Sequence, residues 1–159
     1  MEALAHRVGA CLKSRQLVLA VAESCTGGWV AEVITSISGS SEWFDRGWVT
    51  YSNAAKQEML DVAEGTLREF GAVSEETARE MATGALARSH AQVALSVTGI
   101  AGPTGGTPQK PVGTVCFAWR LPGVETASTT RHFDGNRDQV RRQSVVFALE
   151  DLLRRLDTP

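Results

Sequence analysis

Two predominantly apolar runs, each followed by a glycine-rich segment, constrain the fold of this chain most strongly. Residues 17–22 read LVLAVA and residues 92–97 read QVALSV. Runs of this length, rich in valine and leucine and without polar alternation, are typical of strands that are buried on both faces. Strands of this kind are covered by helices on each side of their sheet, so the chain favours an α/β fold.

The rest of the chain supplies those helices and three further strands. Helical periodicity and capping residues predict helices over residues 4–12, 29–37, 54–60, 66–70, 74–90 and 136–156. The remaining strands are predicted over residues 43–51, with a bulge at Gly47, and over residues 112–121 and 125–133, which form a hairpin. Crossover helices together with a hairpin predict a mixed sheet with helices on both faces. No linker is visible along the chain, so we expect a single domain over residues 1–159.

Composition excludes several classes of function. The 16 lysines and arginines against 18 aspartates and glutamates give a formal net charge of −2, which disfavours nucleic-acid binding. No apolar run approaches the ~20 residues of a bilayer-spanning helix, and no leader precedes the first strand. The three cysteines, Cys11, Cys25 and Cys116, lack disulfide or metal-ligand spacing. We therefore expect a soluble cytoplasmic chain without a metal site.

The sharpest chemical feature is the segment ESCTGG at residues 23–28, which joins a buried strand to a helix. Ser24 and Cys25 are two candidate nucleophiles at a point where free backbone N–H groups can hold an oxyanion. A plain structural role is the alternative, because serine and threonine are common helix caps. A serine nucleophile also requires a base close to it in the fold.

Lys56 is the candidate base. His6, His90 and His132 are poor candidates, since the first two lie in predicted helices and the third near a strand end. Lys56 lies in the first turn of its helix, where the dipole opposes a cation by only ~0.3–1 kcal/mol. Lowering a lysine pKa to neutrality takes ~4 kcal/mol, so burial or a nearby arginine must add the rest. The nearby Tyr51 is positioned to relay a proton or hold the lysine, and a solvated lysine is the alternative.

A second glycine-rich segment, TGIAGPTGG at residues 98–106, follows the other buried strand. Such a loop can wrap a phosphate or ribose with its N–H groups, although a flexible surface loop is the alternative. Arg137 begins the last helix, where a cation is again opposed by the dipole, which hints at an anionic ligand. We expect Arg141 and Arg142 to lie on a solvated helix face.

Together these segments resemble one family. The blocks AESCTGG (22–28), YSNAAK (51–56), VTGIAGP (97–103), PVGTV (111–115) and FDGNR (133–137) closely resemble the CinA C-terminal domain family. These competence/damage-inducible proteins include characterised nicotinamide-mononucleotide deamidases. The resemblance covers essentially the whole chain and implies a three-layer α/β/α sandwich that forms a homodimer or a larger homo-oligomer.

The resemblance also implies an activity and a site. It implies hydrolysis of nicotinamide mononucleotide to nicotinate mononucleotide and ammonia in pyridine-nucleotide salvage, with no metal or cofactor. Ser24 would be the nucleophile, Lys56 its base and Tyr51 a supporting residue. The expected substrate-binding residues are Glu23, Cys25, Thr26, Gly27, Gly28, Thr98, Gly99, Gly102 and Arg137, the last of them on the phosphate.

Two other interpretations remain open at this stage. A cysteine hydrolase would use Cys25, which occupies the same turn as Ser24. A non-catalytic module would bind a nucleotide or a protein partner in competence or DNA-damage responses, using the same glycine loop without turnover.

Overall fold

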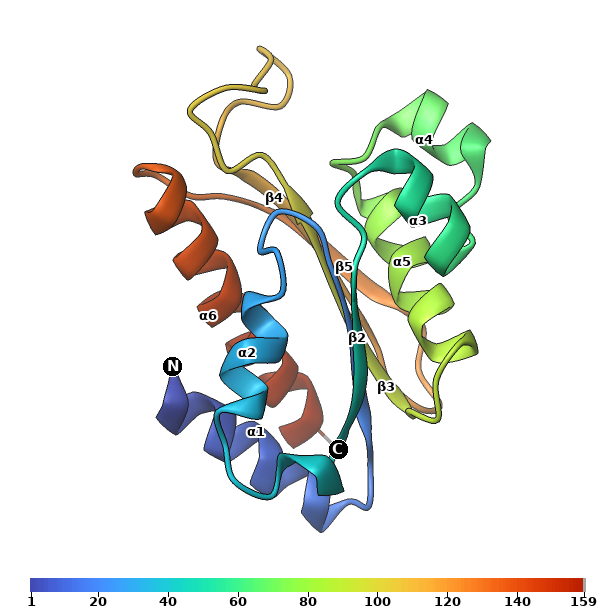
Figure 1. The fold of residues 1–159 in the computed structure, drawn as a ribbon, viewed down its shortest axis with the longest axis vertical. Coiled ribbons are helices and arrows are strands. Elements are labelled where there is room, and N and C mark those ends of the chain that lie inside the picture. The colour runs from blue at the N-terminus through green and yellow to red at the C-terminus, as the bar shows by residue number, and fades with distance from the viewer. Residues whose placement is uncertain (159) are drawn as a thin grey trace.

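The computed structural model describes residues 1–158, in which a five-stranded mixed sheet lies between two layers of helices (Figure 1). The strands are β1 (Leu19–Glu23), β2 (Phe44–Val49), β3 (Val93–Gly99), β4 (Thr114–Arg120) and β5 (Ala127–His132). The helices are α1 (Glu2–Ser14), α2 (Trp29–Thr35), α3 (Asn53–Leu60), α4 (Glu64–Phe70), α5 (Glu75–Ala87) and α6 (Arg137–Asp157), with a short 3₁₀ turn at Ser40–Glu42. The three-layer α/β/α architecture is confirmed.

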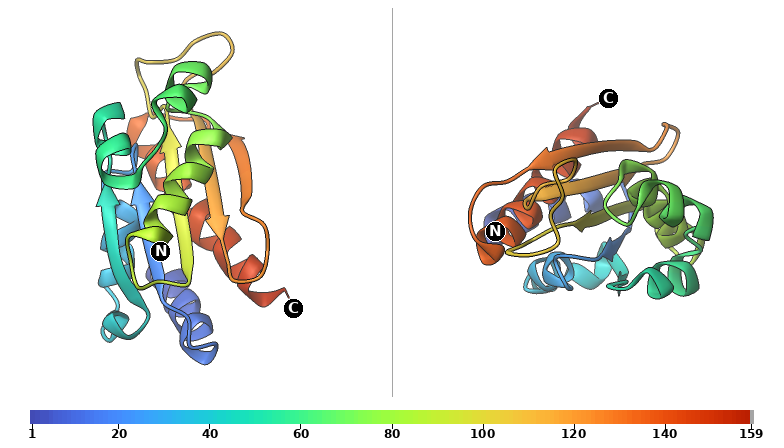
Figure 2. Two further views of the ribbon diagram at one scale, coloured as in Figure 1. Left: turned by 90° about the vertical axis from the view of Figure 1, so that its right-hand side faces the viewer. Right: turned by 90° about the horizontal axis from the view of Figure 1, so that it is seen from above.

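The order of the strands, β2-β1-β3-β4-β5, locates a crevice. Strands β2 and β3 both run parallel to β1 and lie on opposite sides of it, whereas β4 and β5 are antiparallel additions. The connection from β1 to β2 passes through α2 on one face of the sheet, and the connection from β2 to β3 passes through α3–α5 on the other face (Figures 1 and 2). Open α/β sheets bind ligands where connections diverge in this way, outside the carboxyl end of the strands.

The two helical layers differ in how closely they approach the sheet. All five residues of β1 are buried, and successive side chains alternate between the layers. Leu19 and Val21 belong to the core formed with α1, α2 and α6, whereas Ala20 and Ala22 belong to the core formed with α5. The small alanine side chains let α5 lie close to the sheet.

Two local predictions from the sequence are wrong. The helix predicted to extend to about residue 90 ends at Ala87, so His90 lies in the following loop. The irregularity in β2 falls at Asp45 and not at Gly47, because Leu19 pairs with Phe44 and the next residue pairs with Arg46. Gly47 instead pairs in register with Val21, and a Cβ there would lie 3.0 Å from Val21 Cγ2, so close packing explains this glycine.

Helix α3 is held in place by a close backbone contact with α5. A Cβ at Gly84 would overlap the carbonyl oxygen of Leu60, the last residue of α3. Glycine at this point of α5 costs about 1 kcal/mol in helix propensity relative to alanine. The close approach of α5 to the end of α3 offsets that cost.

Gly84→Ala should therefore lower the free energy of unfolding by about 1–3 kcal/mol, despite the gain in helix propensity. Gly65→Ala is the matched control, because a Cβ at this helical glycine meets only the Arg68 side chain, at 3.7 Å. This control should be as stable as the parent or up to about 1 kcal/mol more stable. Urea denaturation measures both, and equal stability of the two variants would contradict the packing described.

Candidate active site

A cavity of about 230 Å³ is lined by residues from the carboxyl ends of β1 and β3 and from the first turn of α6. Among the residues singled out in the sequence, it is lined by Ser24, Cys25, Tyr51, Lys56, Thr98, Gly99, Gly102 and Arg137. Its other walls are Ala72, Val73, Ile100, Ala101, Thr104 and Gly105. The cavity thus combines polar groups from separate segments with an apolar wall, at the crevice that the strand order defines.

A serine and a lysine from different elements meet in this cavity. Lys56 Nζ is hydrogen-bonded to Ser24 Oγ at 2.9 Å and donates to the carbonyl oxygen of Thr50 at 2.7 Å. Lys56 is only 1% exposed, which makes it one of the largest fully buried side chains. Ser52 caps α3 by accepting from the N–H of Ala55, and this cap places Lys56 at the end of the first turn. The nucleophile and base named from the sequence are therefore in direct contact.

Burial lowers the pKa of Lys56 from its usual value of 10.5 to about 8. The cause is the loss of hydration of the ammonium group, which disfavours the charged form. The sequence analysis required either burial or a nearby arginine to lower the pKa of Lys56, and burial is the one that does so. A lysine with this pKa is partly neutral near pH 8, and a neutral amine can accept the proton of a serine hydroxyl.

Glu23 and Thr26 do not line the cavity. The Glu23 carboxylate is buried and accepts from Thr26 Oγ1 at 2.6 Å and from the N–H groups of Val30 and Ala31 at 2.8 and 3.1 Å. Both side chains are thus occupied in holding the start of α2 against the end of β1. The alternation of side chains along β1 could have predicted this position, because Glu23 points to the same side of the sheet as Leu19 and Val21.

Gly27 and Gly28 also lie outside the cavity lining, and they shape the turn that carries Ser24. Their φ angles are +59° and +98°, a region that glycine adopts at little cost. The turn is closed by bonds from Gly27 N–H to Ser24 O and from Trp29 N–H to Thr26 O, each of 3.0 Å. The N–H groups of Cys25 and Thr26 donate to no backbone carbonyl within residues 1–158. Of the two, the Cys25 N–H is the candidate to bind an oxygen atom of a substrate, because Cys25 lines the cavity and Thr26 is fully buried outside it.

The prediction that Arg141 lies on a solvated helix face is wrong. Its side chain is half-buried and donates from Nε to Cys25 O at 3.0 Å and from Nη2 to Thr26 O at 3.1 Å. The guanidinium also lies over the ring of Trp29, with its carbon 5.3 Å from the centroid. Arg142 is exposed, as expected. The two arginines are of the same residue type, so only their angular positions around α6 determine which of them faces the Ser24 turn.

Arg137 and Tyr51 form the opposite rim of the cavity. Arg137 is the first residue of α6, which Asn136 and Gln139 cap reciprocally. Its Nη1 donates to Gly102 O at 2.8 Å and its Nη2 to the Tyr51 hydroxyl at 3.1 Å. Tyr51 is 62% exposed, and its hydroxyl accepts the hydrogen bond from Arg137. Lys56 is held instead by the carbonyl oxygen of Thr50. Arg137 keeps further N–H groups that face no partner within residues 1–158.

The glycine loop after β3 forms the floor of the cavity. Thr98 is buried and its hydroxyl donates to Ala72 O at 2.8 Å, which joins the end of β3 to the segment between α4 and α5. A Cβ at Gly99 would lie 2.8 Å from Val115 Cγ2, so glycine allows β3 to approach β4 there. Thr98 therefore helps to shape the cavity with a hydroxyl that is already bonded to the protein.

The Cys25 thiol lines the cavity but is protected from ionisation. Burial raises the pKa of Cys25 to about 12, so the thiolate needed for nucleophilic attack is scarce at neutral pH. His6, His90 and His132 are absent from the lining, as the sequence led us to expect. The geometry therefore favours the hydroxyl of Ser24 as the nucleophile.

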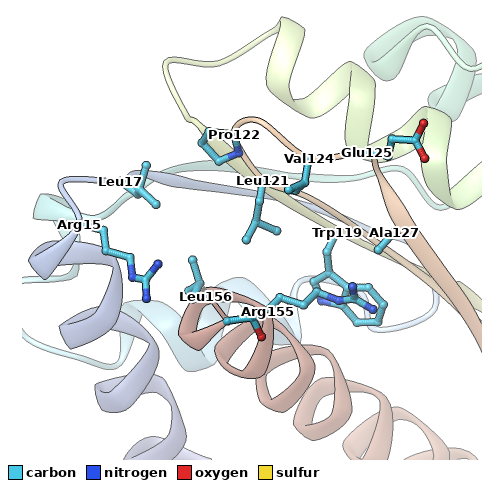
Figure 3. Close-up of a pocket in the computed structure, with 11 residues that line it drawn as sticks. Arg15, Leu17, Trp119, Leu121, Pro122, Val124, Glu125, Ala127, Arg155 and Leu156 are labelled. Atoms are coloured by element: carbon cyan, nitrogen blue, oxygen red, sulfur yellow. The ribbon is translucent and has the colours of Figure 1, made fainter.

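A larger cavity, of about 570 Å³, lies at the other end of the sheet (Figure 3). Leu17, Leu121 and Leu156 contribute much of its wall, and Arg155 stacks on the ring of Trp119 at 4.7 Å. Its lining contains no cysteine, lysine or histidine. It therefore has no counterpart of the serine–lysine pair, and its size does not make it the better candidate.

Within residues 1–158, no helix is both long enough and apolar enough to cross a bilayer. No group of three or more histidine, cysteine, aspartate and glutamate side chains is arranged to hold a metal ion in this part of the chain.

The fold and the cavity together define a class: a three-layer α/β protein with a buried serine–lysine pair at the switch point of its sheet. The model of the CinA C-terminal domain matches residues 1–156. The chain is 54% identical over 149 residues to the nicotinamide-nucleotide amidohydrolase PncC of Escherichia coli K12, covering 94% of this chain and 90% of that protein. It is 51% identical to the protein of the same name from Pseudomonas putida, covering 94% and 93%.

Solved structures agree with this match. The crystal structure of the competence/damage inducible protein CihA from Agrobacterium tumefaciens superposes with a TM-score of 0.94 at 46% identity, covering 99% of this chain and 95% of that one. The chain therefore belongs to the CinA C-terminal domain family, as the sequence blocks indicated.

The lowered pKa of Lys56 predicts a pH dependence of stability. Below pH 8 both the folded and unfolded states carry the ammonium, and the folded state bears the cost of burying it. Between pH 8 and 10.5 the folded protein is the first to lose the proton, so stability rises with pH in this window. The wild type should gain up to about 3 kcal/mol over Lys56→Met across it, measured by urea denaturation. A difference that stays constant with pH would contradict the burial of a titrating amine.

Proposed function

We propose that this protein is a serine amidohydrolase that converts nicotinamide mononucleotide to nicotinate mononucleotide and ammonia. One observation carries the proposal: Ser24 Oγ lies 2.9 Å from the buried amine of Lys56, inside a cavity. The names of the relatives from E. coli and P. putida support the substrate class. The apolar residues Val73, Ile100 and Ala101 offer a wall against which a pyridinium ring can lie.

In the first half of the proposed reaction, neutral Lys56 takes the proton of the Ser24 hydroxyl as Oγ attacks the carboxamide carbon. The tetrahedral intermediate carries its negative charge on the former carbonyl oxygen. When the carbon–nitrogen bond breaks, the Lys56 ammonium gives its proton to the leaving nitrogen, which departs as ammonia. The product of this half is an ester between Ser24 Oγ and the nicotinate carbonyl.

In the second half, water attacks the ester carbon while Lys56 accepts one proton from that water. The bond to Ser24 Oγ breaks, Oγ recovers the proton from Lys56, and the acid mononucleotide leaves. The N–H group of Cys25, which has no backbone partner, is the proposed oxyanion donor in both halves. Donors of this kind typically contribute 10²–10³-fold in rate.

Arg137 is the proposed contact for the phosphate of the substrate. It lies on the rim of the cavity, and two of its N–H groups fix its position through Gly102 O and Tyr51. The remaining donors suit a planar recognition of phosphate oxygens. Tyr51 is thereby assigned to orient Arg137 at the cavity rim.

Several expectations stay predictions. They are the single domain over residues 1–159, the homodimer or larger homo-oligomer, the cytoplasmic location and the role in pyridine-nucleotide salvage. The non-catalytic interpretation, a nucleotide-binding or partner-binding module, is an alternative outcome of the experiment below.

The proposal predicts ammonia release from nicotinamide mononucleotide that depends on both Ser24 and Lys56. Ser24→Ala and Lys56→Met should each lower kcat by 10³-fold or more, because one removes the nucleophile and the other its base. Cys25→Ala is the matched control in the same turn and should stay within a few-fold of wild type. An enzyme-coupled ammonia assay measures all three, with circular dichroism as a check of folding.

Two results would overturn this assignment. Loss of activity in Cys25→Ala with retention in Ser24→Ala would favour the cysteine hydrolase. Tight binding of the mononucleotide by the wild type without ammonia release would favour the non-catalytic module. In the same assay, nicotinamide riboside should have a higher KM than the mononucleotide, because it lacks the phosphate that Arg137 is proposed to bind.

A further inference from the structure

Arg141 ties the turn that carries Ser24 to α6. Its guanidinium donates two separate hydrogen bonds, to the carbonyl oxygens of Cys25 and Thr26, and stacks on Trp29. These two carbonyl groups belong to the Cys25–Thr26 and Thr26–Gly27 peptide units, the second and third after the nucleophile. A planar guanidinium can hold two acceptors in a fixed relation, which a lysine ammonium on a flexible stem cannot do.

The two hydrogen bonds determine where the N–H groups of the turn point. In a planar trans peptide, the carbonyl of one residue and the N–H of the next point in opposite directions. Because Thr26 O faces Arg141, the Gly27 N–H points away from it, and there it meets Ser24 O. Ser24 O is thereby held by the Gly27 N–H, so the Cys25 N–H of the same peptide unit points the other way. Cys25 lines the cavity, whereas Thr26 is fully buried outside it.

The same helix holds the other side of the cavity. Arg137 and Arg141 are four residues apart on α6, so they project from one face of it, one turn apart. Arg137 reaches the glycine loop at Gly102 and the segment after β2 at Tyr51, while Arg141 reaches the Ser24 turn. The first two turns of α6 thus contact three segments that come together around the cavity.

We propose that Arg141 is a positioning residue, which fixes the turn after Ser24 through the Cys25 and Thr26 carbonyls so that the Cys25 N–H faces the oxyanion. Arg141 does not itself touch the substrate in this account. The inference rests on the proposed amidohydrolase reaction, because an oxyanion forms only if Ser24 attacks a carbonyl group. A displacement of about 1 Å in such a site can cost roughly 10²-fold in rate.

The test compares Arg141→Lys with Arg142→Lys, the matched control on the exposed face of the same helix. Arg141→Lys keeps the charge but loses the two-pronged donor, so kcat on nicotinamide mononucleotide should fall roughly ten- to hundredfold while KM changes less than threefold. Arg142→Lys should stay within twofold in both. A merely structural role would instead lower the folded fraction, which thermal unfolding measures in parallel.

Two further measurements test the role of Arg141. In Arg141→Ala, ethylguanidinium added at millimolar concentration should restore part of kcat, and the same addition should leave Ser24→Ala inactive. A fluorophosphonate probe, which labels reactive serines without requiring the proposed substrate, should label Ser24 at least tenfold more slowly in Arg141→Lys than in Arg142→Lys.

The outcomes separate the two proposals. If the wild type releases ammonia and Arg141→Lys keeps its kcat, the inference about Arg141 is wrong and the proposed function stands. If the wild type releases no ammonia, the proposed function is wrong, and the rate of Ser24 labelling decides the role of Arg141 on its own. A wild type that neither releases ammonia nor reacts with the probe overturns both.

Discussion

The burial of one amine is the constraint on which the rest of this site depends. Lys56 is removed from water and held between the hydroxyl of Ser24 and the carbonyl of Thr50. Burying an ammonium is costly, and this cost lowers its pKa toward neutrality. The helix that carries this side chain, α3, packs closely on α5 at Gly84. The free energy spent on burying Lys56 of α3 thus gives the cavity an amine with a lowered pKa.

The other groups of the site are held by the sheet and by α6. The reversal of strand order at β1 brings the turn after β1 and the loop after β3 to one crevice. Helix α6 then links these segments through Arg137 and Arg141. Backbone carbonyls are the partners in most of these links, so the geometry is set by main-chain positions. Rigid supports of this kind let a site hold donors ready before charge develops.

The sequence predicts the elements well because their signals are local. The apolar run before Ser24, the caps at Ser74 and Asn136 and the glycines after each strand all depend on near neighbours, and the structure confirms them. The pairing of Ser24 with Lys56 is different, since 32 residues separate them along the chain. The family blocks pointed to this pairing, whereas periodicity alone did not.

Other parts of the site leave little trace in the sequence. The carbonyl of Thr50 holds the lysine, and a backbone carbonyl has no residue signature. Arg141 and Arg142 are identical in type, and only the phase of α6 against the Ser24 turn distinguishes them. Glu23 was among the substrate-binding residues expected from the family resemblance, yet strand alternation turns it beneath α2. These misses share one cause, which is that tertiary packing decides which face of an element meets the cavity.

The most direct test of this account is the pH dependence of kcat/KM for nicotinamide mononucleotide between pH 7 and 10. If neutral Lys56 is the base, kcat/KM should rise with pH through an apparent pKa of about 8 and then level off, because deprotonation of the amine activates Ser24. The residual activity of Lys56→Met should lack this rise. A profile that is flat or falls across pH 8, or one that persists in Lys56→Met, would contradict the central claim.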